Sequence, residues 1–399
     1  MKRMLKEGEH LDGIGLLKRF GGSQPSFEST SDIASVPFAR FCLQRAQADE
    51  SVQKAIAAYR DYVAEELSYV LGLTHNGPDG RGFGKAALAF LTEHESRAEE
   101  LSAEEQGRIA ALRQALSKAV GGAKPSPYYV LLVADGDGMG RVIEELSRWD
   151  GAAGLGGHVR QQVFSRALSR FAARCRDIVG QRCEQPIGWG NLIYAGGDDV
   201  MALLPVDTAL ATVRALYDAF AASVSAPLSG VSSRPTLSAA MVIAHSLEDL
   251  GTVRKVGENT LHRIAKEGLG RNSLAITLMK RSGEPLSVGG KWDVFDRHLS
   301  ALVESYADHE VPFGLGYEWG RLADLCRRAK VREELVGKLA LSVLKSKAES
   351  AHSRLAERAG AIQAAAELRQ LADELVLARQ IFQCSFRDVS HAAGRGATT

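Results

Sequence analysis

Apolar residues recur with two different spacings along the chain, and the changes of spacing divide it into three zones. Residues 1–125 and 286–399 are rich in Ala, Leu, Glu and Arg, and their apolar residues recur at helical spacing. Residues 126–285 alternate short apolar runs with helical stretches, and Pro125-Ser126-Pro127 lies at their start as a linker. The pattern predicts an α+β domain at 126–285 between two mainly helical domains at 1–125 and 286–399.

The middle zone predicts one sheet with helices packed against it. Tyr128–Ala134 is a continuous apolar run, as expected for a buried central strand. Further strand-like runs occur at 191–195, 200–204, 235–244 and 273–279, and helical spacing occurs at 158–178, 207–224 and 247–266. The order is β-α-β-β-α-β followed by α-β, which is a ferredoxin-like sheet with one extra helix and strand.

Carboxylates occur at two places that this topology brings together. Asp135 ends the first strand, and Gly196-Gly197-Asp198-Asp199 is the hairpin turn between the second and third strands. Because the central first strand is antiparallel to the third, the three carboxylates converge at one edge of the sheet. Like charges at short range repel unless a cation lies among them, and hard divalent ions prefer oxygen ligands. Two such ions can activate a ribose hydroxyl beside a triphosphate, which the glycines would allow to approach the backbone.

Each acidic motif also has a simpler interpretation. Asp-Gly is a common turn, and Gly-Gly-Asp-Asp could be only a hairpin loop. Residues 135–140, Asp-Gly-Asp-Gly-Met-Gly, could be a degenerate dinucleotide-binding loop, but the acid at the strand end and the glycine spacing argue against this. The occurrence of both motifs at adjacent positions of one sheet favours the metal site.

Positive charge lies in the segment that joins the last helix to the last strand. Lys266 ends that helix, and Arg271 follows in Gly270-Arg271-Asn272. The two side chains could hold the β- and γ-phosphates of a nucleotide. A lysine at a helix C-terminus is also favoured by helix-end electrostatics, so a purely structural role is the alternative for Lys266.

Together these residues carry a resemblance to a known family. The residues concerned are Asp135, the Gly196–Asp199 turn, Ala265-Lys266 and Gly270-Arg271-Asn272. They resemble the cyclase-type palm of GGDEF diguanylate cyclases and of the large subunit of type III CRISPR effector complexes. The turn continues as Val200–Pro205 rather than as Glu-Phe. The segments similar to the type III-B, or Cmr-type, large subunit are Thr236–Ala240, Ile243–His245, Gly8–Arg19 and Ser29–Phe38. The resemblance covers nearly the whole chain.

The resemblance implies a nucleotidyltransferase that converts ATP into cyclic oligoadenylate in antiviral defence. Target RNA bound to crRNA, in a multi-subunit Cmr-type complex, would switch it on. The resemblance also implies a two-metal Mg²⁺ or Mn²⁺ site, with Asp135, Asp198 and Asp199 as metal ligands and catalytic residues. The nucleotide-binding positions implied in the same way are Gly136, Ser165, Gly196, Gly197, Lys266 and Arg271. Asp137 would be an outer acid of the site or a turn former.

The chain departs from the family in ways that leave rival functions open. It contains no His-Asp dipeptide of a nuclease domain, and nothing before Gly8 could hold that domain or a first palm. A second nucleotide site would then come from another chain or from self-association, or else this chain is a fragment of a longer protein. Asp12 and Gly15 stand where relatives have a zinc-binding cysteine pair, so no zinc is expected. The rivals are a non-catalytic scaffold of a crRNA ribonucleoprotein and a stand-alone cyclase that makes a cyclic dinucleotide.

Composition and the remaining motifs limit the protein's location and its partners. Lys and Arg number 49 against 48 Asp and Glu, which gives no bulk attraction to nucleic acid or membranes. The five cysteines include no C-x-x-C pair, which fits a cytoplasmic protein, and no apolar run approaches the ~18 residues of a membrane span. Residues 74–85 end in Gly-Lys but fail the P-loop spacing. The basic residues in 327–332, which are Arg327, Arg328, Lys330 and Arg332, are a solvated face or an RNA or subunit contact.

Overall fold

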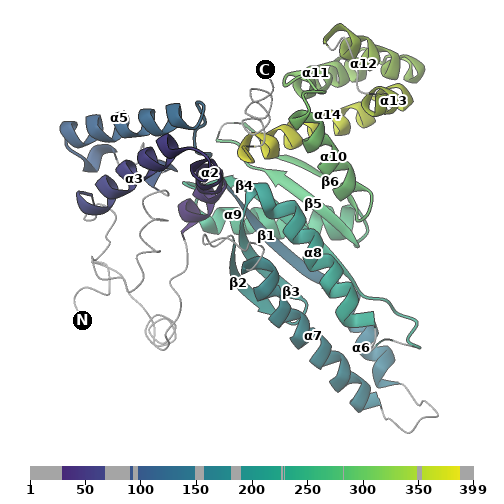
Figure 1. Ribbon diagram of the computed structural model, residues 1–399. Helices are drawn as coiled ribbons and strands as arrows, with labels where there is room; N and C mark the ends of the chain where they lie inside the picture. The colour runs from purple at the N-terminus through teal and green to yellow at the C-terminus, as the bar shows by residue number, and fades with distance from the viewer. Residues whose placement is uncertain are drawn as a thin grey trace.

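Along the sequence, helices come both before and after the strands of a central sheet. The computed structural model of the chain describes residues 29–67, 90–92, 98–148, 157–180, 190–225, 228, 230–281, 283–347 and 353–386. Within them, α2 (Thr30–Ala46), α3 (Glu50–Glu65) and α5 (Ala103–Ala119) come before the sheet (Figure 1). Ser29 and Ser102 begin α2 and α5 with capping boxes, in which each hydroxyl accepts a backbone N–H of the first turn.

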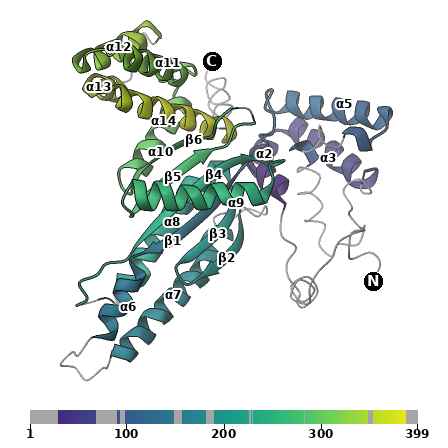
Figure 2. The ribbon, with the colours of Figure 1, turned by 180° about the vertical axis from the view of Figure 1, so that it is seen from behind.

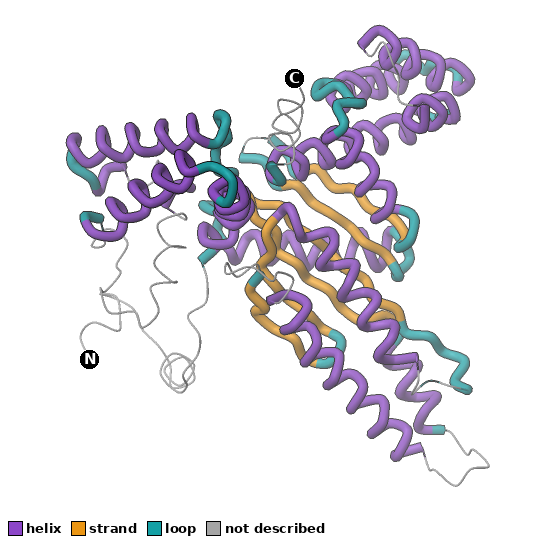
Figure 3. Tube along the Cα trace, in the orientation of Figure 1, coloured by secondary structure: helices purple, strands orange, loops and turns teal. Residues whose placement is uncertain are grey.

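The sheet is mixed, and its strand order makes β1 central (Figure 3). Its strands are β1 (Tyr128–Asp137), β2 (Asn191–Gly196), β3 (Asp199–Pro205), β4 (Thr236–His245), β5 (Ser273–Leu278) and β6 (Leu286–Lys291). The order is β2-β3-β1-β4-β5-β6, in which β1 is antiparallel to β3 and β4 while β4 and β5 are parallel. The predicted α+β class and the antiparallel pairing of the first and third strands are confirmed.

Helices cover both faces of the sheet, because the side chains of β1 alternate between two buried clusters. The helices concerned are α6 (Met139–Ser147), α7 (Gly157–Gly180), α8 (Val206–Ser225), α9 (Leu250–Asn259) and the π-helical η2 (Thr260–Gly268). Val130 and Leu132 belong to the cluster of α7 and α8, whereas Tyr129 and Leu131 belong to that of α2, α9 and η2. Figures 1 and 2 show these two layers from opposite sides.

The C-terminal helices pack on one another and on the β6 edge of the sheet. They are α10 (Phe295–Ala307), α11 (Leu315–Arg328), α12 (Glu333–Lys347), α13 (Ser353–Ala361) and α14 (Ala365–Cys384). The fully buried Trp319 of α11 donates its indole N–H to the Ala340 carbonyl of α12 at 3.2 Å. Arg214 of α8 bonds Asp293 and Asp296 and so ties this layer to the sheet. Among the described helices, none has the length and apolar character needed to cross a membrane.

Two elements were not predicted, and one predicted boundary is wrong. The structure adds α6 and β6, so Ser273–Leu278 is not the last strand. Asp135 does not end β1, because Gly136 and Asp137 continue the ladder opposite Leu237 and Thr236 of β4. The adjacent glycines of β6 hide it from a strand pattern, since glycine weakens isolated strands. Glycine is nevertheless required at position 289, where a Cβ atom would lie 2.8 Å from the Leu274 carbonyl oxygen.

Candidate active site

Three carboxylates meet at the edge of the sheet where β1 runs beside the β2–β3 hairpin. Asp135 lies in β1, Asp198 in the turn and Asp199 at the start of β3, and one oxygen of each lies within 4.8 Å of the others. The register pairs Ala134 with Val200, which brings Asp135 next to the hairpin end. The predicted convergence of the three carboxylates is therefore confirmed.

Glycines shape this turn in two distinct ways. Gly197 has a φ of +74°, and it is the first residue of a two-residue hairpin loop between the paired Gly196 and Asp199. A positive φ at this position is typical of a type II′ turn and favours glycine. A Cβ atom on Gly197 would meet nothing within 4 Å, so the backbone here is open to an approaching group. At Gly196, by contrast, a Cβ atom would overlap the hydroxyl of Tyr194.

The charges in the cluster favour a bound cation. Asp135 and Asp198 are half-buried, and Asp199 is exposed. Burial, together with the charge of Asp199, raises the pKa of the Asp198 carboxyl, although a backbone hydrogen bond opposes the shift. A divalent ion among the three oxygens would relieve this repulsion, and carboxylate oxygens are ligands that hard divalent ions prefer. The donor set therefore fits a divalent metal ion.

Lys266 lies beside the acidic cluster, on η2. Its ammonium contacts Asp135 Oδ2, lies 3.5 Å from the Gly136 carbonyl oxygen and lies 3.8 Å from Asp137 Oδ1. Burial, assisted by the charge of Arg271, lowers the pKa of Lys266 to about 8. The contact with Asp135 acts in the opposite direction, because a carboxylate stabilises the ammonium form. A largely buried cation thus adjoins the three carboxylates, as the sequence indicated.

Asp137 lies inside β1 rather than in a turn, and it is only 4% exposed. Its Oδ2 accepts hydrogen bonds from the hydroxyls of Thr236 and Ser238, at 2.8 and 2.7 Å, and from the Asn272 backbone N–H at 3.0 Å. The exposed Arg271 side chain has its Nε 4.0 Å from Asp137 Oδ1. Asp137 therefore joins the end of β1 to the segment that carries Arg271.

Two residues that the sequence did not single out hold the same segment. Lys291 of β6 donates to the carbonyls of Gly270 and Arg271, at 2.9 and 2.5 Å. Tyr217 of α8 donates its hydroxyl to Asn272 Oδ1 at 3.1 Å. The roles of both residues cannot be predicted from a local sequence motif, because their hydrogen-bond partners are 20 to 55 positions away in the chain.

Other predicted positions stay apart from these contacts or outside the described residues. Ser165 lies on the exposed side of α7, where its carbonyl accepts the Ser169 hydroxyl, so its nucleotide contact stays a prediction. The basic residues 327–332 are at the end of α11 and beyond it, and Arg327 pairs with Asp324 at 3.1 Å. RNA contact by this cluster also stays a prediction. Two further sequence predictions concern residues outside those that the structure describes. They are the Gly-Lys loop at 74–85 and the absence of a zinc-binding cysteine pair at Asp12 and Gly15.

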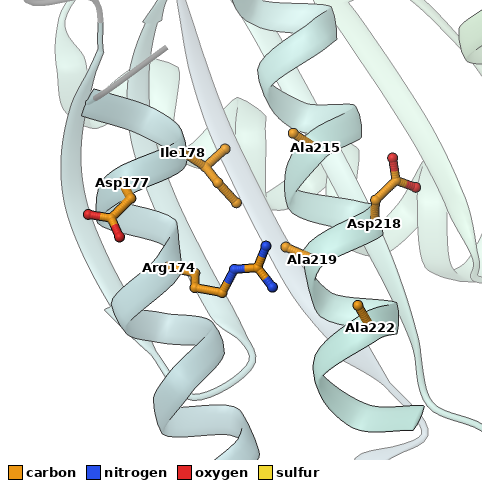
Figure 4. A pocket seen from close by; sticks show the side chains of 7 residues that line it. All are labelled: Arg174, Asp177, Ile178, Ala215, Asp218, Ala219 and Ala222. Carbon is orange, nitrogen blue, oxygen red and sulfur yellow. The ribbon is translucent and has the colours of Figure 1, made fainter.

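A groove of about 630 Å³ lies between α7 and α8 (Figure 4). Ala215, Ala219 and Ala222 line one wall, and Arg174 extends from α7 toward them. The lining includes none of the three clustered carboxylates or Lys266. The groove therefore adds nothing to the chemistry of the acidic cluster.

A family model and a curated protein that are similar to this chain both point to the same family. A family model described as Cas10/Cmr2, second palm domain, matches residues 128–275. The CRISPR system Cmr subunit Cmr2 of Pyrococcus furiosus is 28% identical over 311 residues, which are 71% of this chain and 33% of that protein. The chain thus spans about a third of the length of this curated relative.

A solved structure of a Cmr-type complex agrees at the level of the fold. A type III-B Cmr-beta complex in the apo state matches with a TM-score of 0.51 and 13% identity, over 92% of this chain and 48% of that chain. A Csm1-Csm4 cassette in complex with cA4 matches with a TM-score of 0.40 and 14% identity, over 64% of this chain and 36% of that chain. At 13% identity the likeness to the Cmr-beta chain concerns the fold alone.

Proposed function

Because the chain belongs to the Cas10/Cmr2 large subunits of type III CRISPR complexes through the second palm domain at 128–275, we propose that this palm converts ATP into cyclic oligoadenylate. The observation that carries the proposal is the meeting of Asp135, Asp198 and Asp199 within 4.8 Å, with the Lys266 ammonium at their side. Carboxylate oxygens can bind metal ions and the neighbouring ammonium can bind phosphate, so the arrangement favours a site for a metal-bound triphosphate over a surface without function.

The three carboxylates would hold two Mg²⁺ or Mn²⁺ ions. When bound, such ions make a 3′-hydroxyl more acidic and offset charge that develops on the phosphate under attack. Asp198 is suited to this role because its burial disfavours a lone negative charge, so its carboxylate gains from a cation partner. The protein would position the three carboxylate oxygens around the metal ions. The β1–β3 register and the tight β2–β3 turn support this arrangement.

Lys266 and Arg271 would bind the β- and γ-phosphates. The Lys266 ammonium contacts the carboxylate of Asp135, so it lies beside the acidic cluster. The Arg271 side chain is 58% exposed, so its guanidinium is accessible to a phosphate from solvent. The open backbone at Gly197 allows the nucleotide to lie against the turn. Gly136, Gly196 and Ser165 complete the proposed nucleotide contacts.

One palm supplies one nucleotide site, and joining two adenylates requires two sites that face each other. We infer that the second site lies outside the palm at 128–275, on a further part of a longer protein, on another subunit of a Cmr-type complex or on a second copy of this chain, since the chain spans about a third of its curated relative. In this proposal crRNA and target RNA act as partners that switch the reaction on. The basic residues 327–332 are candidates for RNA or subunit contact.

Mass spectrometry of the products formed from ATP and Mn²⁺ tests this function. Wild-type protein should yield cyclic adenylates at a rate that rises faster than linearly with protein concentration if two copies pair. Asp198→Ala/Asp199→Ala should yield none, whereas Glu99→Ala/Glu100→Ala removes an exposed acidic pair elsewhere and should change nothing. A cyclic dinucleotide made from GTP would point to a stand-alone cyclase. No product, even from the RNA-loaded complex, would contradict catalysis and favour a scaffold.

A further inference from the structure

Three consecutive residues beside the acidic cluster have left-handed backbone conformations. Gly270, Arg271 and Asn272 have φ angles of +73°, +62° and +48°. Glycine adopts this region freely and asparagine tolerates it, but a long side chain such as that of arginine is disfavoured there. Surrounding groups must therefore hold the segment in place, and backbone strain of this kind is concentrated at binding sites.

The segment is fixed from three directions by hydrogen bonds. From β1, Asp137 Oδ2 accepts the Asn272 N–H at 3.0 Å. From β6, the Lys291 ammonium binds the Gly270 carbonyl at 2.9 Å, and from α8, the Tyr217 hydroxyl binds Asn272 Oδ1 at 3.1 Å. Asp137 is the one buried charge among these anchors, since Lys291 is exposed and Tyr217 is neutral.

Asp137 also faces the two cations of the site. Its Oδ1 is buried and makes no hydrogen bond, and it lies 3.8 Å from Lys266 Nζ and 4.0 Å from Arg271 Nε. Thr236 and Ser238 of β4 orient the carboxylate by donating hydrogen bonds to Oδ2. One oxygen thus fixes the backbone of the loop while the other is turned toward both phosphate-binding side chains.

We propose that Asp137 is a positioning residue for the triphosphate rather than a metal ligand. It anchors the Gly270–Asn272 loop to the sheet, and it draws Lys266 and Arg271 to the same side of the acidic cluster. This proposal rests on the proposed function, because it assumes that the two cations meet the phosphates of ATP. It predicts that loss of the Asp137 charge weakens ATP binding without removing the metal site.

The test compares Asp137→Asn with wild type by hydrogen exchange and by calorimetric titration. In the variant, amides in peptides covering residues 266–273 should exchange faster, because the anchor of the Asn272 N–H is weakened. Affinity for ATP with Mn²⁺ should fall about tenfold, the usual scale for losing a hydrogen bond to a charged group. Mn²⁺ affinity should stay within about twofold, whereas Asp135→Asn should lose most of it.

Thr236→Val and Thr236→Ser form a matched pair that keeps the test valid if Asp137→Asn folds poorly. The valine removes the hydroxyl that orients Asp137, so it should weaken ATP binding, and the serine retains the hydroxyl and should restore it. Equal loss of Mn²⁺ binding in Asp137→Asn and Asp135→Asn would overturn the proposal, and so would unchanged loop exchange or unchanged ATP affinity. If wild-type protein bound no ATP, the proposed function would fail, while loop exchange would still decide whether Asp137 is an anchor.

Discussion

Gly136 of β1 lies directly against the carboxylate of Asp198. A Cβ atom at this position would be 2.6 Å from Asp198 Oδ2 and 2.8 Å from Asp198 Cβ. Both distances are well inside normal van der Waals contact, so an alanine would displace the Asp198 side chain. The absence of a side chain at position 136 is thus what allows Asp198 to join Asp135 and Asp199.

We expect Gly136→Ala to weaken Mn²⁺ binding about tenfold, because one of the three oxygens would leave the cluster. Titration of Mn²⁺ into folded protein, checked by circular dichroism, measures the effect. Gly140→Ala is the matched control, since a Cβ atom there meets nothing within 4 Å. Equal Mn²⁺ affinities in the two variants would show that Asp198 does not need the space at Gly136.

The residues at strand ends and in turns were accessible from the sequence. Asp135, Asp198, Asp199 and Lys266 were identified because acidic and glycine motifs next to apolar runs are local signals. Tyr217 and Lys291 were not, since their roles come from contacts between distant parts of the chain.

At the scale of elements, the prediction failed where glycine breaks the apolar pattern. Gly138, with a φ of +75°, precedes α6, and its neighbourhood of Asp and Gly resembles a turn rather than a helix start. The helix is nevertheless stable in context, because Val142 and Leu146 bury one face against the sheet cluster. Five strands and the helices at 158–178 and 207–224 were found because their periods are uninterrupted.

Helix α6 is also tied to the segment before β4 through Glu145. Its carboxylate accepts the backbone N–H groups of Ser232 and Ser233 at 2.5 and 2.9 Å, and these bonds lower the pKa of Glu145 from 4.5 to about 2. A lowered pKa in the folded state stabilises the fold above pH 4.5, and the benefit is lost as the pH falls toward 2.

We therefore expect Glu145→Gln to lower the melting temperature at pH 7, and the difference from wild type to shrink as the pH is reduced toward 2. Thermal unfolding followed at several pH values checks this. Glu144→Gln is the control, since Glu144 is an exposed neighbour that pairs with Arg148 at the C-terminal end of α6. A difference that grows in acid would contradict the role given to Glu145.

At the scale of the whole molecule, Arg214 joins the sheet layer to the C-terminal helices. It pairs with Asp218, Asp293 and Asp296, and Asp296 is only 5% exposed. Removing the arginine would leave a buried carboxylate without its counter-charge, which is among the more costly changes in a folded protein.

Arg214→Leu should reduce the free energy of unfolding by about 3 kcal/mol, measured by urea titration. Arg254→Leu removes an arginine from an exposed helix pair with Glu258 and should cost about 0.5 kcal/mol or less. Adding Asp296→Asn to Arg214→Leu should recover part of the loss. Similar losses in the two arginine variants would indicate that Asp296 tolerates burial without Arg214.

The proposed function depends most on a divalent metal site formed by Asp135, Asp198 and Asp199. Electron paramagnetic resonance of Mn²⁺ titrated into the purified chain tests it without a second palm, since the signal of free Mn²⁺ falls as the ion binds. Wild-type protein should bind Mn²⁺, Glu99→Ala/Glu100→Ala should match it, and Asp198→Ala/Asp199→Ala should lose at least about tenfold in affinity. Equal binding by all three proteins would contradict the metal site and the function built on it.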